Sequence, residues 1–187
     1  MDSTALWMLA TVVLPLWLAA GIGDWACHRV TRIESTSGWR ESALHAAQLA
    51  EVGSIVVAAL VFEPNGALVG FAVAMIVAHE VTVWIDLRYA GRLRRIPPVE
   101  QMIHAFLEVL PWTALLLLLA HAWRSVGGLR TSLGDLEPRF ADYGIPLAWR
   151  LGLAVAIGAL AVVPYAEELW RCWRARERAA AASAAAG

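Results

Sequence analysis

The sequence predicts an all-α integral membrane protein, a bundle of about five transmembrane helices of which four enclose a polar metal site. Two observations predict this fold class. Apolar residues gather in long blocks, and four of the blocks carry a histidine paired with a carboxylate. The chain has 187 residues, is 59% hydrophobic and has a net charge of −1, whereas soluble domains are about 45–50% apolar. Because no basic stripe is present, nucleic acid is not an expected partner.

Five apolar segments have the length of about 20 residues that a helix needs to cross a bilayer. They span approximately 5–28, 42–62, 67–87, 99–123 and 146–170. The first has no positively charged start and no cleavage site before Asp24, so it is expected to remain as a helix. A Glu63-Pro64-Asn65-Gly66 turn ends the second, and Pro97-Pro98 precedes the fourth. We expect one transmembrane domain over 1–178 and a disordered Ala-rich tail at 179–187.

The arginines predict how the bundle is oriented. All 15 basic residues are arginine, and 11 of them cluster from Arg29 to Arg40, from Arg88 to Arg95 and from Arg171 to Arg178. These clusters follow the first, third and fifth spans, while the short turn after the second span has none. The positive-inside rule therefore predicts an N-terminus outside and a C-terminus in the cytoplasm. The connection before the fifth span, expected to lie outside, is of mixed charge and carries Arg124, Arg130 and Arg139.

Four of the spans carry a histidine and a carboxylate on one helical face. The pairs are Asp24/His28, Glu41/His45, His79/Asp86 and Glu100/His104, with Glu108 one turn beyond the last. Spacings of four or seven residues stack side chains on the same face of a helix. Under the predicted topology all the pairs lie near the cytoplasmic boundary at a similar depth, so we expect them to form one site.

A metal site is the favoured explanation for these residues. An ionisable residue near the middle of a membrane helix costs about 2.5–3.5 kcal/mol, and a structural Zn²⁺ can supply about 10 kcal/mol or more. Imidazole and carboxylate are ligands of Fe, Zn and Mn, and their number exceeds what one tetrahedral ion needs. We therefore expect two divalent ions, with iron favoured and zinc or manganese as alternatives. A proton path without metal and a bis-histidine haem are less favoured.

Other polar residues are expected to support this site. Four could hydrogen-bond the ligands, namely Glu51, Gln48, Gln101 and Glu34. Two carboxylates, Glu108 and Glu80, are candidate catalytic groups. The loop that carries Arg29, Arg32 and Arg40 is favoured as a plain connector, and the alternative is that these arginines hold an anionic substrate head group. Glu167 and Glu168 could also support the ligands, but a solvated helix end near Arg171 is the favoured interpretation. The run from Arg88 to Arg95 is favoured as a determinant of topology over a site for a head group.

The motifs around the first two histidines resemble those of a bacterial multi-pass membrane family. The shared pattern is GDWxCHR…IExTSGxxES…H, read here from Gly23-Asp24-Trp25-Ala26-Cys27-His28-Arg29 through Ile33-Glu34 to His45. The resemblance covers the first four spans, implies the bacterial cytoplasmic (inner) membrane and implies no activity. More loosely, the chain resembles membrane di-iron fatty-acid hydroxylases and desaturases. Their HxxxH and HxxHH boxes are absent, so this likeness implies a reaction class and no residue roles.

The favoured function is a membrane-embedded dimetal oxidoreductase or oxygenase that acts on a lipid-like or quinone-like substrate at the cytoplasmic side. Its partners would be a membrane lipid or hydrophobic small molecule and an electron donor. One alternative is a zinc-dependent membrane hydrolase, in which the metal lowers the pKa of water to about 7, although the sequence lacks HExxH. The other is a metal or proton transporter or sensor, for which no internal repeat is found.

Overall fold

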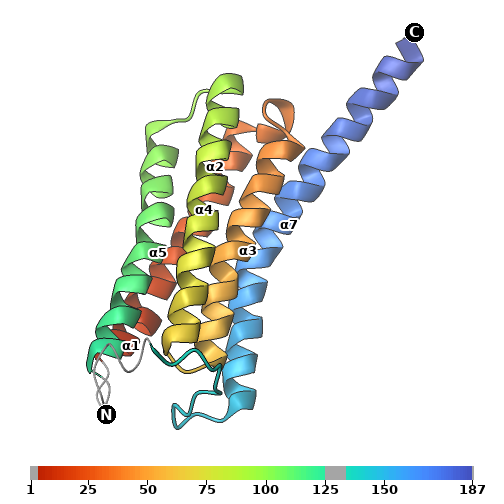
Figure 1. The fold of residues 1–187 in the computed structure, drawn as a ribbon. Coiled ribbons are helices and arrows are strands. Elements are labelled where there is room, and N and C mark those ends of the chain that lie inside the picture. Colours follow the sequence, from red (N-terminus) through yellow and green to blue (C-terminus); the bar gives the residue numbers. More distant parts are fainter. Residues whose placement is uncertain (1–3, 125–133, 187) are drawn as a thin grey trace.

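The computed structural model describes residues 4–124 and 134–186, and it confirms an all-α bundle with five helices long and apolar enough to cross a membrane (Figure 1). The first span joins α1 (Thr4–Met8), the π-helical η1 (Leu9–Val13) and α2 (Leu14–Thr31). The short η2 (Ile33–Ser35) leads to the four further helices: α3 (Trp39–Val61), α4 (Gly66–Leu93), α5 (Pro98–Arg124) and α7 (Leu147–Ala186). Each predicted span overlaps one of these helices. Positions 125–133 of the predicted connection before the fifth span lie outside the described residues.

The helices alternate in direction, so that connections gather at two ends (Figure 1). We call the end with the α2–α3 and α4–α5 connections the site end, and the end with the α3–α4 turn the far end. α3 packs against α4 and α7, and α2 packs against α5 and α7. This alternation brings the last residues of α2 and α4 to the same level as the first residues of α3 and α5. α7 runs from the far end to the site end and continues past it.

Local sequence explains where the helices begin and end. Arg32 adopts a left-handed conformation with φ 54° directly after α2, and Gly38 has φ 71° directly before α3. The left-handed region suits glycine and ends an α-helix. At the far end the Asn65 side chain accepts hydrogen bonds from the backbone N–H groups of Ala67 and Leu68 and so caps α4. These turns fix the register at which α3 and α4 start.

Apolar packing holds the half of the bundle toward the far end. One buried cluster joins Ile55, Ile76 and Leu115 of α3, α4 and α5, together with Val69 and Ala72. A second joins the first span to α3 and α5 through Val13, Trp17, Val52 and Leu110. Large apolar side chains also cover the outside of the bundle, as expected where the solvent is lipid. Most of the buried charged side chains lie toward the site end, whereas Arg150 is buried near the start of α7.

α7 differs from the sequence prediction in its last residues. The Ala-rich stretch was expected to be disordered, but α7 continues as helix through Ala186 and stands beyond the bundle (Figure 1). Alanine has the strongest helix propensity, so a helix already formed by packing can extend through it. α7 also contains Pro164, which cannot donate a helical hydrogen bond and favours the bend visible along this helix.

Candidate metal centre

Three helices meet at the site end with the same spacing of a carboxylate followed four residues later by a histidine. The pairs are Asp24/His28 on α2, Glu41/His45 on α3 and Glu100/His104 on α5. All of these side chains except His104 are nearly inaccessible, with Asp24 2%, His45 3% and the other three 0% exposed. The structure thus brings these three predicted pairs together in the interior.

A carboxylate from the fifth span lies at the centre of this group. Glu168 of α7 is fully buried and contacts two histidines. Its Oε2 lies 2.8 Å from Nδ1 of His28 and its Oε1 lies 3.0 Å from Nδ1 of His45. The two imidazole rings stack, with centroids 4.5 Å apart and an angle of 10° between their planes. Because a carboxylate only accepts hydrogen bonds, Nδ1–H of each ring donates to Glu168.

The other ring nitrogens point toward further carboxylates. Nε2 of His28 lies 3.3 Å from Oε1 of Glu100 and 3.4 Å from Oδ1 of Asp24. Nε2 of His45 lies 3.3 Å from Oδ2 of Asp86. Neither Nε2 has a hydrogen-bond partner in the described part of the chain. If the rings are neutral, each Nε2 lone pair faces carboxylate lone pairs, an arrangement that is repulsive unless a cation or a proton lies between them.

Two overlapping groups have the composition and spacing of metal sites. In one, ligand atoms of Asp24, His28, Glu100 and His104 all lie within 4.8 Å of one another, and in the other the same holds for His28, Glu41 and His45. Neighbouring ligands of a tetrahedral ion with bonds of about 2.0–2.2 Å are about 3.3–3.6 Å apart. The two distances from Nε2 of His28 match this spacing, and Glu168 orients the ligand rings as carboxylates commonly do at metal sites.

Arg94, at the C-terminal end of α4, enters the group from the α4–α5 connection. Its Nε lies 3.1 Å from both carboxylate oxygens of Glu41, and its Nη2 makes close contacts with Glu41 and Glu100. Burial acts to lower the pKa of the guanidinium, but the bonds to Glu41 and Glu100 outweigh it and raise the pKa. Arg94 is therefore a permanent cation that shares two candidate ligands with any metal.

We call this group the histidine layer; its members are Asp24, His28, Glu41, His45, Asp86, Arg94, Glu100, His104 and Glu168. Among the described residues it contains five carboxylates and one guanidinium, which leaves four negative charges when the imidazoles are neutral. Protonating all three imidazoles would reduce this excess, but it would stack two cations at 4.5 Å. Like charges at about 4 Å repel by roughly 4 kcal/mol at an effective dielectric constant of about 20. Two divalent ions would balance the charge without this repulsion.

The predicted pair on α4 is separated. Asp86 joins the histidine layer through His45, whereas His79 lies two turns deeper and contacts Glu51 of α3, with Nδ1 3.6 Å from Oε2. Thr82 donates a hydrogen bond of 2.8 Å to the other oxygen of Glu51. Seven residues of helix span roughly 10 Å, so a common face does not give a common site. His79 and Glu51 are correspondingly outside both ligand groups.

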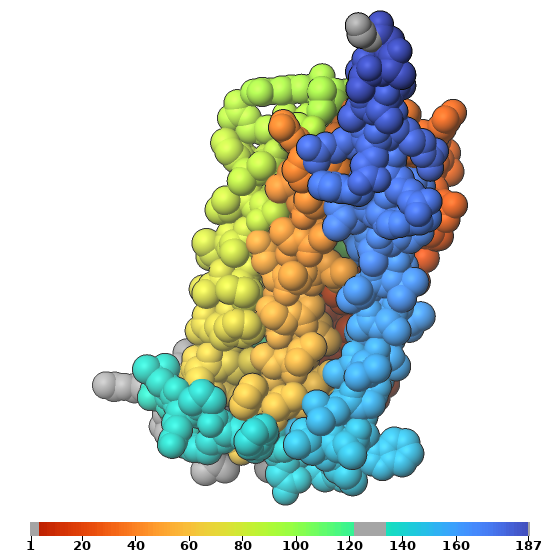
Figure 2. Space-filling model, turned by 90° about the vertical axis from the view of Figure 1, so that its right-hand side faces the viewer, coloured from red at the N-terminus to blue at the C-terminus, as the bar shows by residue number. Residues whose placement is uncertain are grey.

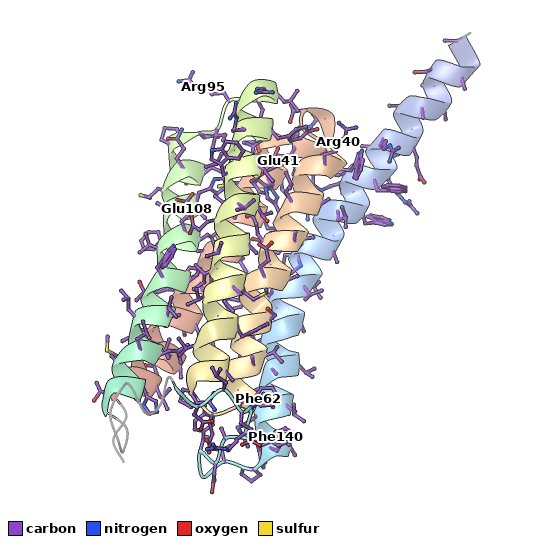
Figure 3. All side chains as sticks on the ribbon, in the orientation of Figure 1. Arg40, Glu41, Phe62, Arg95, Glu108 and Phe140 are labelled. Atoms are coloured by element: carbon purple, nitrogen blue, oxygen red, sulfur yellow. The ribbon has the colours of Figure 1, made fainter. Side chains whose placement is uncertain are left out.

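Several other predicted site residues lie away from the layer. Glu108 is further along α5 than the layer, as Figure 3 shows relative to Glu41, and it belongs to neither ligand group. Glu80 accepts a 2.7 Å hydrogen bond from Trp112 at the surface. Gln101 donates to the carbonyl of Ile96 and so supports the start of α5 rather than a ligand. Gln48 is half-buried beside His45 at a small cavity, and its buried Nε2 has no partner in the described residues.

The three arginines that were candidates for binding a head group lie on the outer surface of the site end. Arg29 packs over the Trp25 ring, 5.1 Å from its centroid, and Arg40 packs 5.8 Å from the Trp39 centroid. Arg32 has a 76% exposed side chain. Glu34 forms its close ion pair with Arg171, so it braces α7 against the α2–α3 connection and contacts no candidate ligand. None of these arginines contacts the histidine layer in the described structure.

Two central residues were missed by sequence reasoning. For Glu168 a solvated helix end was favoured over a supporting role beside the ligands, but the buried face of α7 runs through Ile157, Tyr165, Glu168 and Cys172. That helical periodicity is the signal that would have placed Glu168 inside. Arg94 was interpreted as a determinant of topology. Its neighbour Arg95 is exposed and points outward (Figure 3), and nothing in the local sequence distinguishes the two.

Comparisons with known proteins do not identify this centre. No family model, curated protein or solved structure matches the chain. The functional argument therefore depends on the residues of the histidine layer themselves.

Proposed function

We propose that the protein is a membrane-embedded metalloprotein that holds two divalent transition-metal ions in the histidine layer and acts as an oxidoreductase. Iron is favoured because mixed imidazole and carboxylate ligands from several helices of a bundle are typical of di-iron centres. The metals would supply redox chemistry, and the substrate would be a lipid-like or quinone-like molecule from the surrounding membrane. The arginine distribution favours a cytoplasmic location for the centre, in a bacterial inner membrane.

One observation carries the proposal. Glu168 fixes the Nδ1 atoms of His28 and His45, and so turns both Nε2 atoms toward carboxylates with which a neutral imidazole cannot hydrogen-bond. A metal ion between them would convert this repulsion into coordination. The same arrangement, a histidine held by a carboxylate through one nitrogen and by a metal through the other, recurs at metal sites in proteins.

The position of Arg94 favours a second candidate with one ion. Arg94 donates to both carboxylate oxygens of Glu41, the one carboxylate of the second ligand group, whereas Oε2 of Glu100 in the first group has no hydrogen-bond partner among the described residues. A single Zn²⁺ held by the group on α2 and α5 would then make the protein a zinc-dependent hydrolase, in which the ion supplies an activated water. The number and identity of the metals decide between the two candidates.

The decisive measurement is metal analysis with an absorption spectrum, on protein purified in mild detergent. Two irons per chain without a Soret band would support the di-iron proposal, and one zinc would support the hydrolase instead. A Soret band would mean haem. Protein that folds normally but holds no metal would overturn both candidates and would leave a protonated histidine network as the explanation.

The ligand assignment is tested by His45→Ala and His104→Ala, one in each ligand group. Each variant is expected to lose metal, while His121→Ala, outside both groups, is the matched control and is expected to keep it. If both ligand variants retain the full metal content, the assignment of the centre is wrong even where the wild type contains metal.

A further inference from the structure

A groove runs along the seam between α3 and α7. Its volume is about 450 Å³, within the range of about 300–1,000 Å³ that ligand pockets occupy. The wall is apolar and mostly small, and includes Gly53, Val57, Ala154, Gly158 and Ala161. Figure 2, which faces these two helices, shows the surface hollowed between α3 in orange and α7 in blue.

The groove begins beside the histidine layer. Ala46, adjacent to His45, and Ala166 and Leu169, which flank Glu168, line one end, while Val57 and Ala154 line the other. The stretch of α3 from Ala46 to Val57 spans roughly 16 Å. Half of the hydrocarbon core of a bilayer is about 15 Å thick. The groove therefore has the length of one leaflet and starts at the level of the charged site.

Small residues keep this seam open. In membrane helices, glycine and alanine usually allow two backbones to pack closely together. Here a Cβ placed on Gly53 or on Gly158 would meet no heavy atom within 4 Å. The two glycines thus face empty space within the groove, and the space they leave is available to another molecule.

A small cavity shares part of its wall with the groove and has His45 of the histidine layer in its lining. Its volume is about 30 Å³, and it shares Trp17, Leu49, Ala161 and Tyr165 with the groove wall. Polar residues complete its lining, namely His45, Gln48 and His79. The amide nitrogen of Gln48 and both ring nitrogens of His79 have no hydrogen-bond partner among the described residues, although His79 is only 4% exposed. The inner side of the groove thus offers hydrogen-bonding atoms to a polar group, or to a bridging water.

We propose that the groove binds one hydrocarbon chain of a membrane lipid, with the more polar end of that lipid at the cavity beside His45 and Gln48. The chain is chosen over other occupants because the groove lies within the membrane-spanning parts of α3 and α7, where hydrocarbon is the solvent. An amphiphile in that leaflet matches both the apolar wall and the polar inner end. The inference rests on the proposed function, since it makes this lipid the substrate of the metal centre.

The test uses purified wild-type protein in phosphatidylcholine vesicles that contain a small fraction of phosphatidylcholine with a photoreactive diazirine in one chain. After irradiation, peptide mapping is expected to find the label concentrated on the groove-lining residues of α3 and α7. Gly53→Leu combined with Gly158→Leu fills the groove and is expected to reduce this labelling several-fold. Leucine has higher helix propensity than glycine, so these changes favour the helices.

Gly70→Leu combined with Gly152→Leu is the matched control. A Cβ at either of these positions also meets nothing within 4 Å, but neither residue lines the groove, so the labelling pattern is expected to stay unchanged. Labelling spread evenly over all lipid-facing helices, or unaffected by filling the groove, would overturn the inference. So would a bifunctional cross-linker that joined groove residues of two protein chains, because a second copy would then occupy the groove.

Metal content, measured on the same samples, separates the two proposals. Labelled groove residues in protein without metal would overturn the proposed function and leave the lipid site standing. Metal-loaded protein without selective labelling would overturn the lipid site and leave the proposed function standing. Where the filled groove excludes the label and metal content is unchanged, both proposals are supported together.

Discussion

The bundle contains two buried histidine groups, and they differ in how many helices reach them. In the histidine layer, α2, α3, α4, α5 and α7 all contribute a charged side chain. Around His79, two turns deeper, α3 and α4 supply Glu51 and Thr82. His79 has the helical spacing of a ligand pair with Asp86, yet Asp86 lies in the layer, and among the described residues it is the layer that gathers enough donors for a metal. Convergence of helices, more than spacing along one helix, defines the candidate centre.

The electrostatics of the two groups differ in the same way. Beside His79 there is one carboxylate, Glu51, whose side chain is 18% exposed and accepts a hydrogen bond from Thr82. The histidine layer retains excess negative charge after Arg94 is counted, and burying uncompensated charge is strongly unfavourable. The layer thus needs cations and the deeper pair does not, which gives a contrast that mutations can test.

The largest effect is expected from removing a histidine of the layer. His28→Ala deletes the residue common to both ligand groups, so nearly all bound metal should be lost. His79→Ala is the matched control on α4, and it should retain metal at the wild-type level. Metal analysis of the two purified variants checks this contrast. Metal loss in His79→Ala equal to that in His28→Ala would mean that the deeper pair belongs to the centre after all.

The next largest effect concerns the buried guanidinium. Arg94→Gln leaves Glu41 and Glu100 without their cation, and breaking a buried ion pair costs about 3–5 kcal/mol. A clear drop in melting temperature is expected, larger in chelator than with metal present, because bound ions would replace part of the lost charge. Thermal unfolding in detergent measures it.

Arg95→Gln is the control for this substitution, since Arg95 is an exposed neighbour (Figure 3). It should leave the melting temperature nearly unchanged. If the two variants unfold alike, the ion pairs of Arg94 contribute nothing to the stability of the layer.

A smaller effect is expected at Glu168. Glu168→Gln keeps the shape of the side chain, but its amide has one oxygen and so can accept a hydrogen bond from Nδ1–H through that oxygen only. Loss of such a supporting carboxylate lowers metal affinity about 10–100-fold. Glu167→Gln is the matched control, because Glu167 accepts a hydrogen bond from Trp25 outside the layer. Metal titration of apoprotein compares them, and equal affinities would remove Glu168 from the centre.

The features that the sequence predicted correctly are those that depend on residues close together along one helix. Apolar blocks specified the spans, and spacing of four residues specified the pairs on α2, α3 and α5, because both are properties of one helix. The depth of His79 was misjudged, since a common face says nothing about height along the helix. The rise per residue of an α-helix already separates His79 from Asp86 by roughly 10 Å along α4.

Glu168 and Arg94 depend on contacts between helices far apart in the chain. Glu168 became part of the layer because α7 packs between α2 and α3 and the Arg171–Glu34 pair braces it there. Arg94 entered because α4 ends one residue before it, which turns its side chain inward. The periodicity of α7 indicates that Glu168 faces inward, but the sequence beside Glu168 or Arg94 does not say which helices each of them meets.

The smallest effect is expected at the far end of the bundle, which contains no residue of the histidine layer. Phe140 stacks on Phe62, with ring centroids 5.5 Å apart, and so holds the segment before α7 against the α3–α4 turn (Figure 3). Phe140→Ala should lower stability by about 0.5–1.5 kcal/mol, the contribution of an aromatic pair, with no change in metal content. Leu136→Ala, an exposed residue of the same segment, is the control and should unfold like the wild type. Thermal unfolding and metal analysis together check it. Metal loss in Phe140→Ala would mean that the two ends of the bundle are coupled, because the pair lies at the opposite end from every residue of the histidine layer.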